Sequence, residues 1–191
     1  MEGENMFAFK VDDEIDLELI NHNGKEELFR LIDDNREHLR KWLVWVDRRT
    51  EPDDFDSIIH SWIQKYADGN GFDAGLRYNG KLVGMLGLHY IDWKNKSTSI
   101  GYFLAEEMQG RGIITRAIKA LLPYLFHSLN LHRIEIQVAA GNLKSMAVPE
   151  RLGFFKEGIL RDGQWLYDHF EDLITYSLLK TEWHLHDQTI H

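Results

Sequence analysis

The sequence contains no cysteine among its 191 residues, and this absence excludes several classes of function. Without cysteine there is no disulfide framework, no thiol nucleophile, no cysteine-ligated zinc site and no thiol redox chemistry. Long hydrophobic runs are missing as well, since no segment approaches the roughly 18 apolar residues that a membrane helix needs. The acidic start, Met1 to Glu4, has no apolar stretch, so we expect no secretory signal and a cytoplasmic protein that does not contact a membrane.

An excess of basic residues is also missing. The chain has 22 lysine and arginine residues against 31 aspartate and glutamate residues, a formal net charge of −9. Nucleic-acid binding needs a basic surface, so direct contact with nucleic acid is not expected. The 43% of hydrophobic and 28% of charged residues are typical of a folded globular protein, and the length fits a single domain over residues 1–191.

The negative charge is unevenly distributed along the chain. Residues 1–75 carry 9 basic and 19 acidic side chains, a net of −10, whereas residues 76–191 carry 13 basic and 12 acidic side chains, a net of +1. The segment 108–133 has no acidic residue and contains the cations Arg111, Arg116, Lys119 and Arg133. This pattern reflects either solvated helix faces or an anion site in the second half and a cation-attracting surface in the first.

Hydrophobic periodicity predicts an alternation of strands and helices. Helical spacing of apolar residues indicates helices over 23–46, 52–66, 113–129 and 142–152. Shorter alternating or apolar runs indicate strands over 15–20, 72–78, 81–91, 97–104, 133–139, 154–160 and 171–179, with a hairpin turn at Asn79-Gly80. Adjacent strands combined with single crossover helices predict a mixed sheet in an α/β or α+β layer arrangement.

The segment after strand 97–104 carries the clearest chemical signal. Gln109-Gly110-Arg111-Gly112 lies between a predicted strand and a predicted helix. Glycines let several backbone N–H groups point one way, and the helix N-terminus adds partial positive charge, so the segment suits phosphate oxygens. It is not a P-loop, and Thr115 stands where a dinucleotide fingerprint has its third glycine. On these residues alone, an ordinary strand-to-helix turn is the alternative.

The glycine loop and four further segments resemble the GNAT superfamily of N-acetyltransferases. Gln109–Thr115 resembles the family's acetyl-coenzyme-A loop, although Ile114 stands where glycine or alanine is usual, and 100–104 is similar to the preceding strand. Asn142-x-x-Ser145 resembles the family's Asn-x-x-Ser turn. Residues 147–154 look like its Ala-x-x-x-x-Leu-Gly-Phe helix end, and 162–169 are similar to its late strand region. The resemblance covers about residues 15–179 and is closest to the ribosomal-protein-serine/alanine (Rim-type) N-acetyltransferases.

The resemblance implies a fold, an activity and a cosubstrate site. The expected fold is the GNAT fold, an α/β (α+β) arrangement with a mixed, mostly antiparallel sheet of about seven strands and helices on both faces. The expected reaction moves an acetyl group from acetyl-CoA to an amine by direct attack, without a metal. Phe103 and Leu104 would offer backbone groups to the pantetheine arm and thioester, and Asn142 would contact the same arm. The residues expected to hold the pyrophosphate are Gln109, Gly110, Arg111, Gly112, Ile113, Ile114 and Thr115.

Acetyl transfer also needs a neutral amine, a stabilised oxyanion and a proton for the leaving thiolate. Ser145 matches the position that assists the thiolate in the family, although a serine in a first helical turn also caps helices. Ser99 and Gln164 stand at the two positions where many relatives carry a glutamate as the general base. Asp162, Asp168, His169 or a chain of waters could replace that base, whereas Asp168 and His169 could equally be a turn or strand-edge pair.

The missing carboxylates bear on the acceptor. Roughly a tenth of an α-amine is neutral at pH 7, against fewer than about one in a thousand for lysine, a difference of about 3 kcal/mol in deprotonation cost. We therefore expect an α-amine of a protein or peptide, in line with ribosomal-protein N-termini as acceptors. The acidic first half suits a cationic acceptor, and Trp42 and Trp45 either line its pocket or belong to the core.

Other functions stay open on the sequence. The acceptor could be a small amine such as a polyamine or an antibiotic, or the chain could be a coenzyme-A-binding module without turnover. A phosphate-binding domain unrelated to acetyl transfer is a third alternative. His184-x-His186 lacks further ligands at a usable spacing, so we expect no metal site there. The sequence leaves open whether the chain forms a homo-oligomer.

Overall fold

The computed structural model describes residues 8–187, with side chains described up to residue 183, and its centre is an open sheet of eight strands. The strand order across the sheet is β1-β2-β3-β4-β5-β6-β8-β7, and the β5–β6 pair is parallel while the other neighbours are antiparallel. The strands are β1 (Ala8–Lys10), β2 (Ile15–Leu19), β3 (Asp73–Tyr78), β4 (Lys81–Asp92), β5 (Ser97–Leu104), β6 (Arg133–Ala139), β7 (Phe155–Leu166) and β8 (His169–Leu179).

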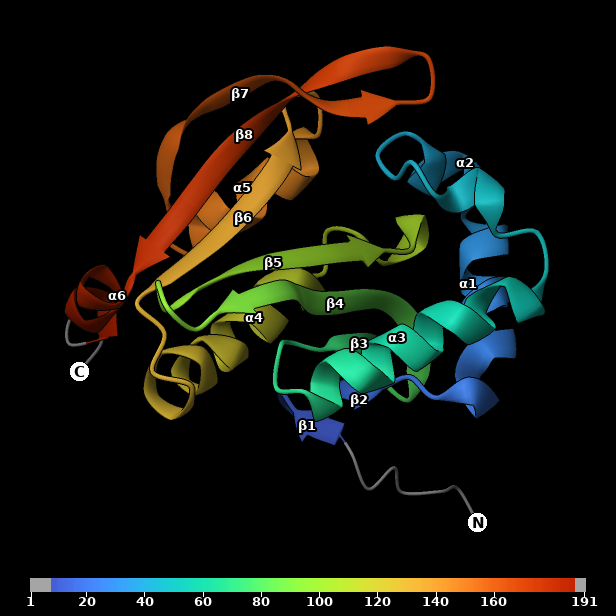
Figure 1. The fold of residues 1–191 in the computed structure, drawn as a ribbon, viewed down its shortest axis with the longest axis horizontal. Helices are drawn as coiled ribbons and strands as arrows, with labels where there is room; N and C mark the ends of the chain where they lie inside the picture. Colours follow the sequence, from blue (N-terminus) through green and yellow to red (C-terminus); the bar gives the residue numbers. More distant parts are fainter. Residues whose placement is uncertain (1–7, 188–191) are drawn as a thin grey trace.

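Helices cover both faces of this sheet (Figure 1). In that view α3 lies in front of the sheet, and α4 and α5 lie behind it. The helices are α1 (Lys25–Asp34), α2 (Arg36–Arg40), α3 (Asp56–Ala67), α4 (Ile113–Pro123), α5 (Leu143–Arg151) and α6 (Lys180–Asp187). The predicted mixed α/β architecture is thus confirmed, and the core lies between the sheet and these helices, with fully buried residues such as Leu28, Leu76, Ile100 and Ala117.

The sheet has one strand more than the seven predicted, because β1 adds to the edge beside β2. This strand is three residues long and exposed throughout, so it leaves no alternating pattern in the sequence. β7 and β8 also run longer than predicted, to Leu166 and from His169, and form one long hairpin. The turn at Asn79-Gly80 is confirmed, since both residues have the positive φ angles, 50° and 80°, of a tight hairpin turn.

The single helix predicted over 23–46 is wrong in its second half. α1 ends at Asp34, α2 is a separate short helix, and residues 41–45 form turns. Asn35 sits at the break: its side-chain N–H donates to the Leu31 carbonyl, and its side-chain oxygen accepts from the Glu106 N–H, both at 2.9 Å. Leu39 and Val46 are buried nonetheless. The helical spacing of the apolar residues therefore predicts their burial correctly, although α1 itself ends at Asp34.

Candidate functional site

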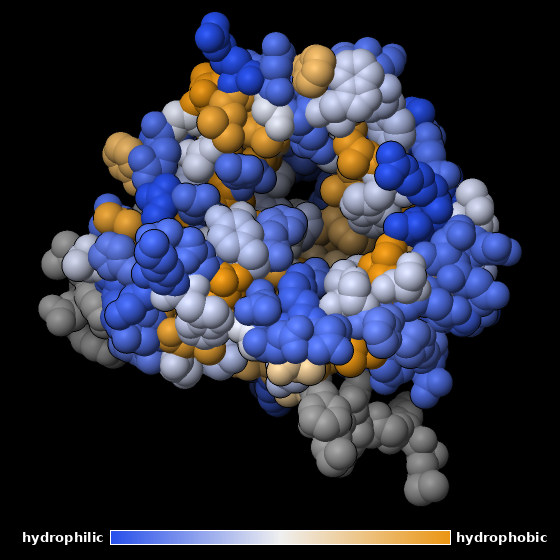
Figure 2. Space-filling view, viewed as in Figure 1, coloured by the Kyte–Doolittle hydropathy of each residue, from blue (hydrophilic) through white to orange (hydrophobic). Residues whose placement is uncertain are grey.

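β5 and β6 form a fork that opens a cavity. The two strands pair at Ser97–Ser99 against Arg133–Glu135 and diverge beyond these positions (Figure 1). A cavity of about 640 Å³ lies in the fork, and the end of β5, Tyr102 to Leu104, lines it. Figure 2 shows the hollow on the front face, in the region bounded by β5, α2 and the β7–β8 hairpin. The splayed strands leave the β6-facing backbone edge of this part of β5 without a strand partner.

The glycine loop forms one wall of this cavity. Gly110 and Gly112 have φ angles of 76° and 71°, in the left-handed region that glycine adopts without strain. A Cβ atom at either position would meet no atom within 4 Å, so the surface of the loop is open. Gly112 immediately precedes α4, whose first N–H groups have no partner within the helix. The loop and the helix end together offer backbone donors and partial positive charge to an anion.

The structure brings most of the predicted cosubstrate residues to this one cavity. Its lining includes Phe103, Leu104, Gln109, Gly110, Gly112, Ile113, Ile114, Thr115 and Asn142, together with Ser145. Arg111 is exposed and lies outside the lining. Gly112 and Arg151, which are 39 positions apart in the chain, thus line the same cavity.

The cluster of cations predicted as an anion site is partly neutralised. Arg116 lines the cavity, but its guanidinium donates to Asp12 and Glu14, each at 2.8 Å. Arg133 pairs in the same way with Glu135 at 2.8 Å and with Glu157 at 2.7 Å. Two of the four cations of the acid-free segment therefore form ion pairs with acidic residues from other parts of the chain.

The opposite wall is formed by the start of α5. The Asn142 side chain caps this helix by accepting a hydrogen bond from the Ser145 N–H at 3.1 Å. The Ser145 hydroxyl does not cap the helix; it donates to the phenol oxygen of Tyr102 at 3.1 Å, and the Tyr102 hydroxyl donates to the Ser145 carbonyl at 3.0 Å. Burial raises the pKa of Tyr102 to about 12. The phenol is therefore neutral across the physiological range and stays a donor.

A third wall is the loop after α2, which carries Trp42. The indole of Trp42 lies over the backbone of Gly141, where an added Cβ would be 3.4 Å from the ring, and Trp42 lines the cavity. Trp45 instead packs on the core, with its ring centroid 5.8 Å from that of Phe103. Of the two tryptophans considered for an acceptor pocket, Trp42 therefore reaches the cavity and Trp45 mainly supports its wall.

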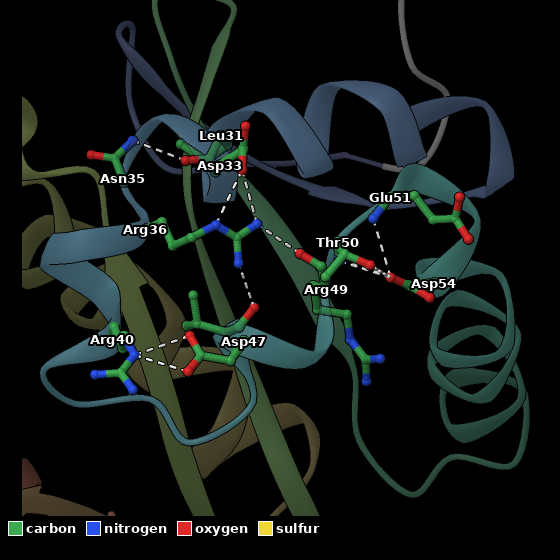
Figure 3. A network of polar contacts seen from close by, with 11 residues as sticks. Leu31, Asp33, Asn35, Arg36, Arg40, Asp47, Arg49, Thr50, Glu51 and Asp54 are labelled. Carbon is green, nitrogen blue, oxygen red and sulfur yellow. Dashed lines mark hydrogen bonds and ion pairs between the residues drawn. The ribbon is translucent and has the colours of Figure 1, made fainter. Parts of the chain in front are cut away.

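Arg36 holds this loop in place (Figure 3). Its guanidinium donates to the Val46 and Arg49 carbonyls, each at 2.7 Å, and pairs with Asp33 at 2.9 Å. Arg40 pairs with Asp47 at 2.9 Å in the same network. These contacts replace the helical hydrogen bonds that end at Arg40, so the loop keeps a defined path from α2 to residue 49.

The β7–β8 hairpin closes over the same loop. The Tyr167 hydroxyl donates to the Leu43 carbonyl at 2.7 Å, and the Gln164 amide donates to the Trp42 carbonyl at 3.3 Å. The Arg40 guanidinium lies 4.0 Å from the centre of the Tyr167 ring. Figure 1 shows the tip of the hairpin near α2, and these contacts join the β7–β8 hairpin to the loop whose residues Trp42 and Leu43 line the cavity.

The residues considered as substitutes for the general base are not brought to the cavity. Asp162 lies at a bend of β7, and Asp168 and His169 lie at the hairpin turn, all exposed and outside the cavity lining. The His169 ring contacts Asp168 at 2.7 Å and Glu171 at 3.2 Å, so it forms a strand-edge cluster. Ser99 is buried at the fork, where β5 and β6 separate.

The acidic side chains of the first half do not line the cavity either. In the described residues up to 75, ten acidic side chains form ion pairs within the chain, and none of the cavity-lining residues is an acid from this part. The pairs involve Asp12, Asp13, Glu14, Glu18, Glu27, Asp33, Asp47, Asp53, Asp56 and Asp73. The acidic side chains of this part of the chain are thus used mostly in ion pairs that stabilise the fold.

Tyr102, His38 and Lys144 also line the cavity, and the sequence assigns none of these side chains a role at the site. The Lys144 ammonium donates to the side-chain oxygen of Gln109 at 2.7 Å, and the amide nitrogen of Gln109 lies 3.0 Å from Nε2 of His38. Burial lowers the pKa of His38, which favours the neutral imidazole. A hydrophobic pattern cannot reveal these contacts, because they join α2, the glycine loop and α5 across the cavity.

Within residues 8–187, no group of three or more potential ligand side chains is placed to hold a metal ion. The side chains of His184 and His186, which we did not expect to bind metal, lie outside the described residues. In the same part of the chain, no helix combines the length and apolar character needed to cross a membrane.

Comparison with known proteins identifies the family. The model of the acetyltransferase (GNAT) domain matches residues 17–155. The chain belongs to the GNAT acetyltransferase family. This GNAT protein is therefore an N-acetyltransferase, and its cosubstrate is acetyl-CoA. The resemblance inferred from the sequence motifs and the expected fold are confirmed.

Individual relatives cover nearly the whole chain. The "Putative ribosomal N-acetyltransferase YdaF" of Bacillus subtilis is 45% identical over 93% of this chain and 98% of its own. The ribosomal-protein-serine acetyltransferase of Escherichia coli is 29% identical over 89% of this chain and 95% of its own. Among solved structures, the microcin C7 self-immunity acetyltransferase MccE in complex with acetyl-CoA and AMP has a TM-score of 0.86 at 30% identity, covering 91% of this chain and 97% of that one.

Proposed function

We propose that this GNAT enzyme acetylates the N-terminal α-amine of a protein, with ribosomal proteins as the first acceptors to consider. The observation that carries this proposal is the lack of a carboxylate base at the fork. The two positions where many relatives have a glutamate are the buried Ser99 and Gln164, whose amide is engaged with the Trp42 carbonyl. The names of the relatives from Bacillus subtilis and Escherichia coli support the same class of acceptor.

The acetyl-CoA site that we assign is the 640 Å³ cavity of the fork. Its open glycine loop and the N-terminus of α4 fit the pyrophosphate, because backbone donors and partial positive charge converge there. The backbone of Phe103 and Leu104, on the unpaired edge of β5, fits the amide groups of the pantetheine arm. When bound there, acetyl-CoA supplies the thioester whose carbonyl the amine attacks.

Ser145 and Tyr102 are the pair that we assign to the leaving thiolate. The Ser145 hydroxyl is held in the cavity wall and can donate a hydrogen bond to negative charge that develops on sulfur. Tyr102 is neutral at physiological pH, so it can orient this hydroxyl and compensate for the bond that the hydroxyl gives up. Asn142 fixes the backbone of Ser145 through the helix cap.

The acceptor amine must arrive neutral, because no lining residue is placed as a strong base. Among the described lining residues the carboxylate is Glu106, whose side chain is 66% exposed at the mouth of the cavity. Burial lowers the pKa of His38, but its Nε2 lies 3.0 Å from the amide nitrogen of Gln109 beside the glycine loop and is engaged there. The free energy needed to deprotonate an α-amine at neutral pH is about 3 kcal/mol lower than for a lysine side chain, so an α-amine suits this site better.

The experiment compares three acceptors at equal concentration with acetyl-CoA: a Ser- or Ala-starting peptide, the same peptide with a blocked N-terminus and one lysine, and spermidine. Mass spectrometry of the products identifies the modified amine. We expect acetylation of the free N-terminus to be at least about tenfold faster than that of lysine, given the difference in pKa. Faster modification of lysine or of spermidine would refute the proposed acceptor class.

A further inference from the structure

A row of three side chains crosses the mouth of the cavity beside the glycine loop. Lys144 on α5 donates to the Gln109 side-chain oxygen at 2.7 Å, and Gln109 in turn reaches His38 on α2 at 3.0 Å. All three residues line the cavity. Gln109 is the first residue of the loop that contains Gly110 and Gly112, so the middle of the row belongs to the proposed pyrophosphate site.

The chemistry of the three groups fixes how the Gln109 amide is turned. An ammonium can donate but not accept, so the amide oxygen must face Lys144. The amide NH₂ then faces Nε2 of His38, which must be the unprotonated nitrogen that accepts. Burial lowers the pKa of this histidine, and the cations of Lys41 and Lys144 act in the same direction against the opposing Glu106. A neutral His38 therefore holds the amide oxygen toward Lys144.

Lys144 and Arg116, two of the cations that line the cavity, differ in the groups with which they pair. Arg116 lines the same cavity, but two carboxylates, Asp12 and Glu14, already neutralise it. In the described part of the chain, Lys144 has no carboxylate within ion-pair distance, and the partner that holds it is a neutral amide. Its full positive charge is therefore directed at the glycine loop and available to an anion.

We propose that Lys144 binds the diphosphate of acetyl-CoA and that Gln109 and His38 aim its ammonium at that group. This inference rests on the acetyl-CoA site proposed above. The backbone donors of the loop are neutral, so a nearby full charge adds the stronger, charge-assisted hydrogen bond to a phosphate oxygen. Phosphate contacts of this kind are weakened by salt, which gives the inference a readout that does not depend on turnover.

The first experiment measures the binding of CoA by calorimetry at low and high salt, with Lys144→Gln and Lys119→Gln as a matched pair. Lys119 is exposed on α4 and lies outside the cavity, so its replacement removes the same charge from the same region. We expect Lys144→Gln to weaken CoA binding by about tenfold at low salt and by clearly less at high salt. Binding of pantetheine, which has no phosphate, should be unchanged. Equal effects of the two substitutions on CoA would overturn the inference.

A second experiment tests the aiming role of Gln109. Gln109→Met keeps the size of the side chain but removes the amide oxygen that accepts the hydrogen bond of Lys144. We expect a loss of CoA affinity of about threefold in the otherwise native chain and no further loss when Lys144→Gln is already present. An equal loss in both backgrounds would show that Gln109 acts on CoA independently of Lys144, and would overturn the aiming role.

The variant Gly112→Glu distinguishes a wrong role for Lys144 from a wrong assignment of the acetyl-CoA site. A carboxylate at this open, left-handed position would clash with the proposed diphosphate in shape and in charge. If Gly112→Glu abolishes CoA binding while Lys144→Gln leaves it intact, the role of Lys144 is refuted and the site stands. If Gly112→Glu also leaves CoA binding intact, the acetyl-CoA site itself is misassigned.

Discussion

The hydroxyl of Ser145 donates a hydrogen bond to the phenol oxygen of Tyr102 at 3.1 Å, and the Tyr102 hydroxyl returns one to the Ser145 carbonyl at 3.0 Å. The two residues are 43 positions apart and come from opposite walls of the fork. This reciprocal pair fixes the position of the hydroxyl that we assign to the leaving thiolate. It also ties the end of β5 to the first turn of α5.

Removal of either hydroxyl should therefore affect turnover more than binding. We expect Ser145→Ala to lower kcat by about 10- to 100-fold with little change in CoA affinity, because the lost interaction forms with charge that develops during the reaction. Tyr102→Phe should lower kcat by a smaller factor, since the Ser145 hydroxyl is still present but no longer oriented. Steady-state kinetics and calorimetry of CoA binding measure the two effects separately.

The double variant decides whether the two residues act as one unit. Adding Tyr102→Phe to Ser145→Ala should cost no further kcat, because Tyr102 acts through the serine hydroxyl. If the factors by which kcat falls in the two single variants instead multiply in the double variant, the phenol contacts the reacting groups independently of Ser145. Urea unfolding of each variant identifies any loss that is due to stability alone.

The sequence predicted the parts of the site that depend on local backbone geometry. Gly110 and Gly112 mark left-handed positions that side chains would strain, and Asn142 marks a helix start, so both features are visible as short motifs. Tyr102 and Lys144 were not predicted, because their roles depend on contacts between distant elements. Arg116 was predicted as part of an anion site, but its charge is matched by carboxylates from near the start of the chain.

In the loop after α2, the hydrophobic spacing of the sequence again predicts a backbone structure that tertiary contacts change. Helical spacing extended the first helix to Val46, but Asn35 ends it, and the chain then follows the hydrogen bonds of Arg36. The spacing is informative about burial, since Leu39 and Val46 are in the core. It is uninformative about the backbone, because the Arg36 side chain beside the break donates to carbonyls that lie 10 and 13 residues further along the chain.

Arg36→Met should consequently release the loop that carries Trp42. The guanidinium donates to two loop carbonyls, so its loss should lower the free energy of unfolding by about 3 kcal/mol. The KM of the acceptor should rise several-fold, since Trp42 lines the cavity beside the hairpin. Arg48→Met is the control, because Arg48 is exposed in the same loop. Similar unfolding curves and KM values for both variants would contradict the role of Arg36.

We expect His38 and His169 to make the free energy of unfolding depend on pH in opposite directions. Burial holds the pKa of His38 below its usual value. The unfolded chain therefore binds more protons at this site, and the contribution of neutral His38 to stability is present above about pH 6.5 and is lost as the pH falls through the lower folded pKa. Hydrogen bonds with Asp168 and Glu171 instead raise the pKa of His169. Its contribution is present below about pH 6.5 and is lost as the pH rises through the folded pKa.

Urea unfolding of His38→Gln and His169→Gln across about pH 5 to 8 tests these signs. Relative to the native chain, the stability deficit of His38→Gln should be largest at the alkaline end and shrink toward the acidic end. The deficit of His169→Gln should be largest at the acidic end and vanish at the alkaline end, although its exposed position makes it the smaller of the two. A pH-independent deficit in His38→Gln would show that the pKa of the imidazole is the same in the folded and unfolded chain.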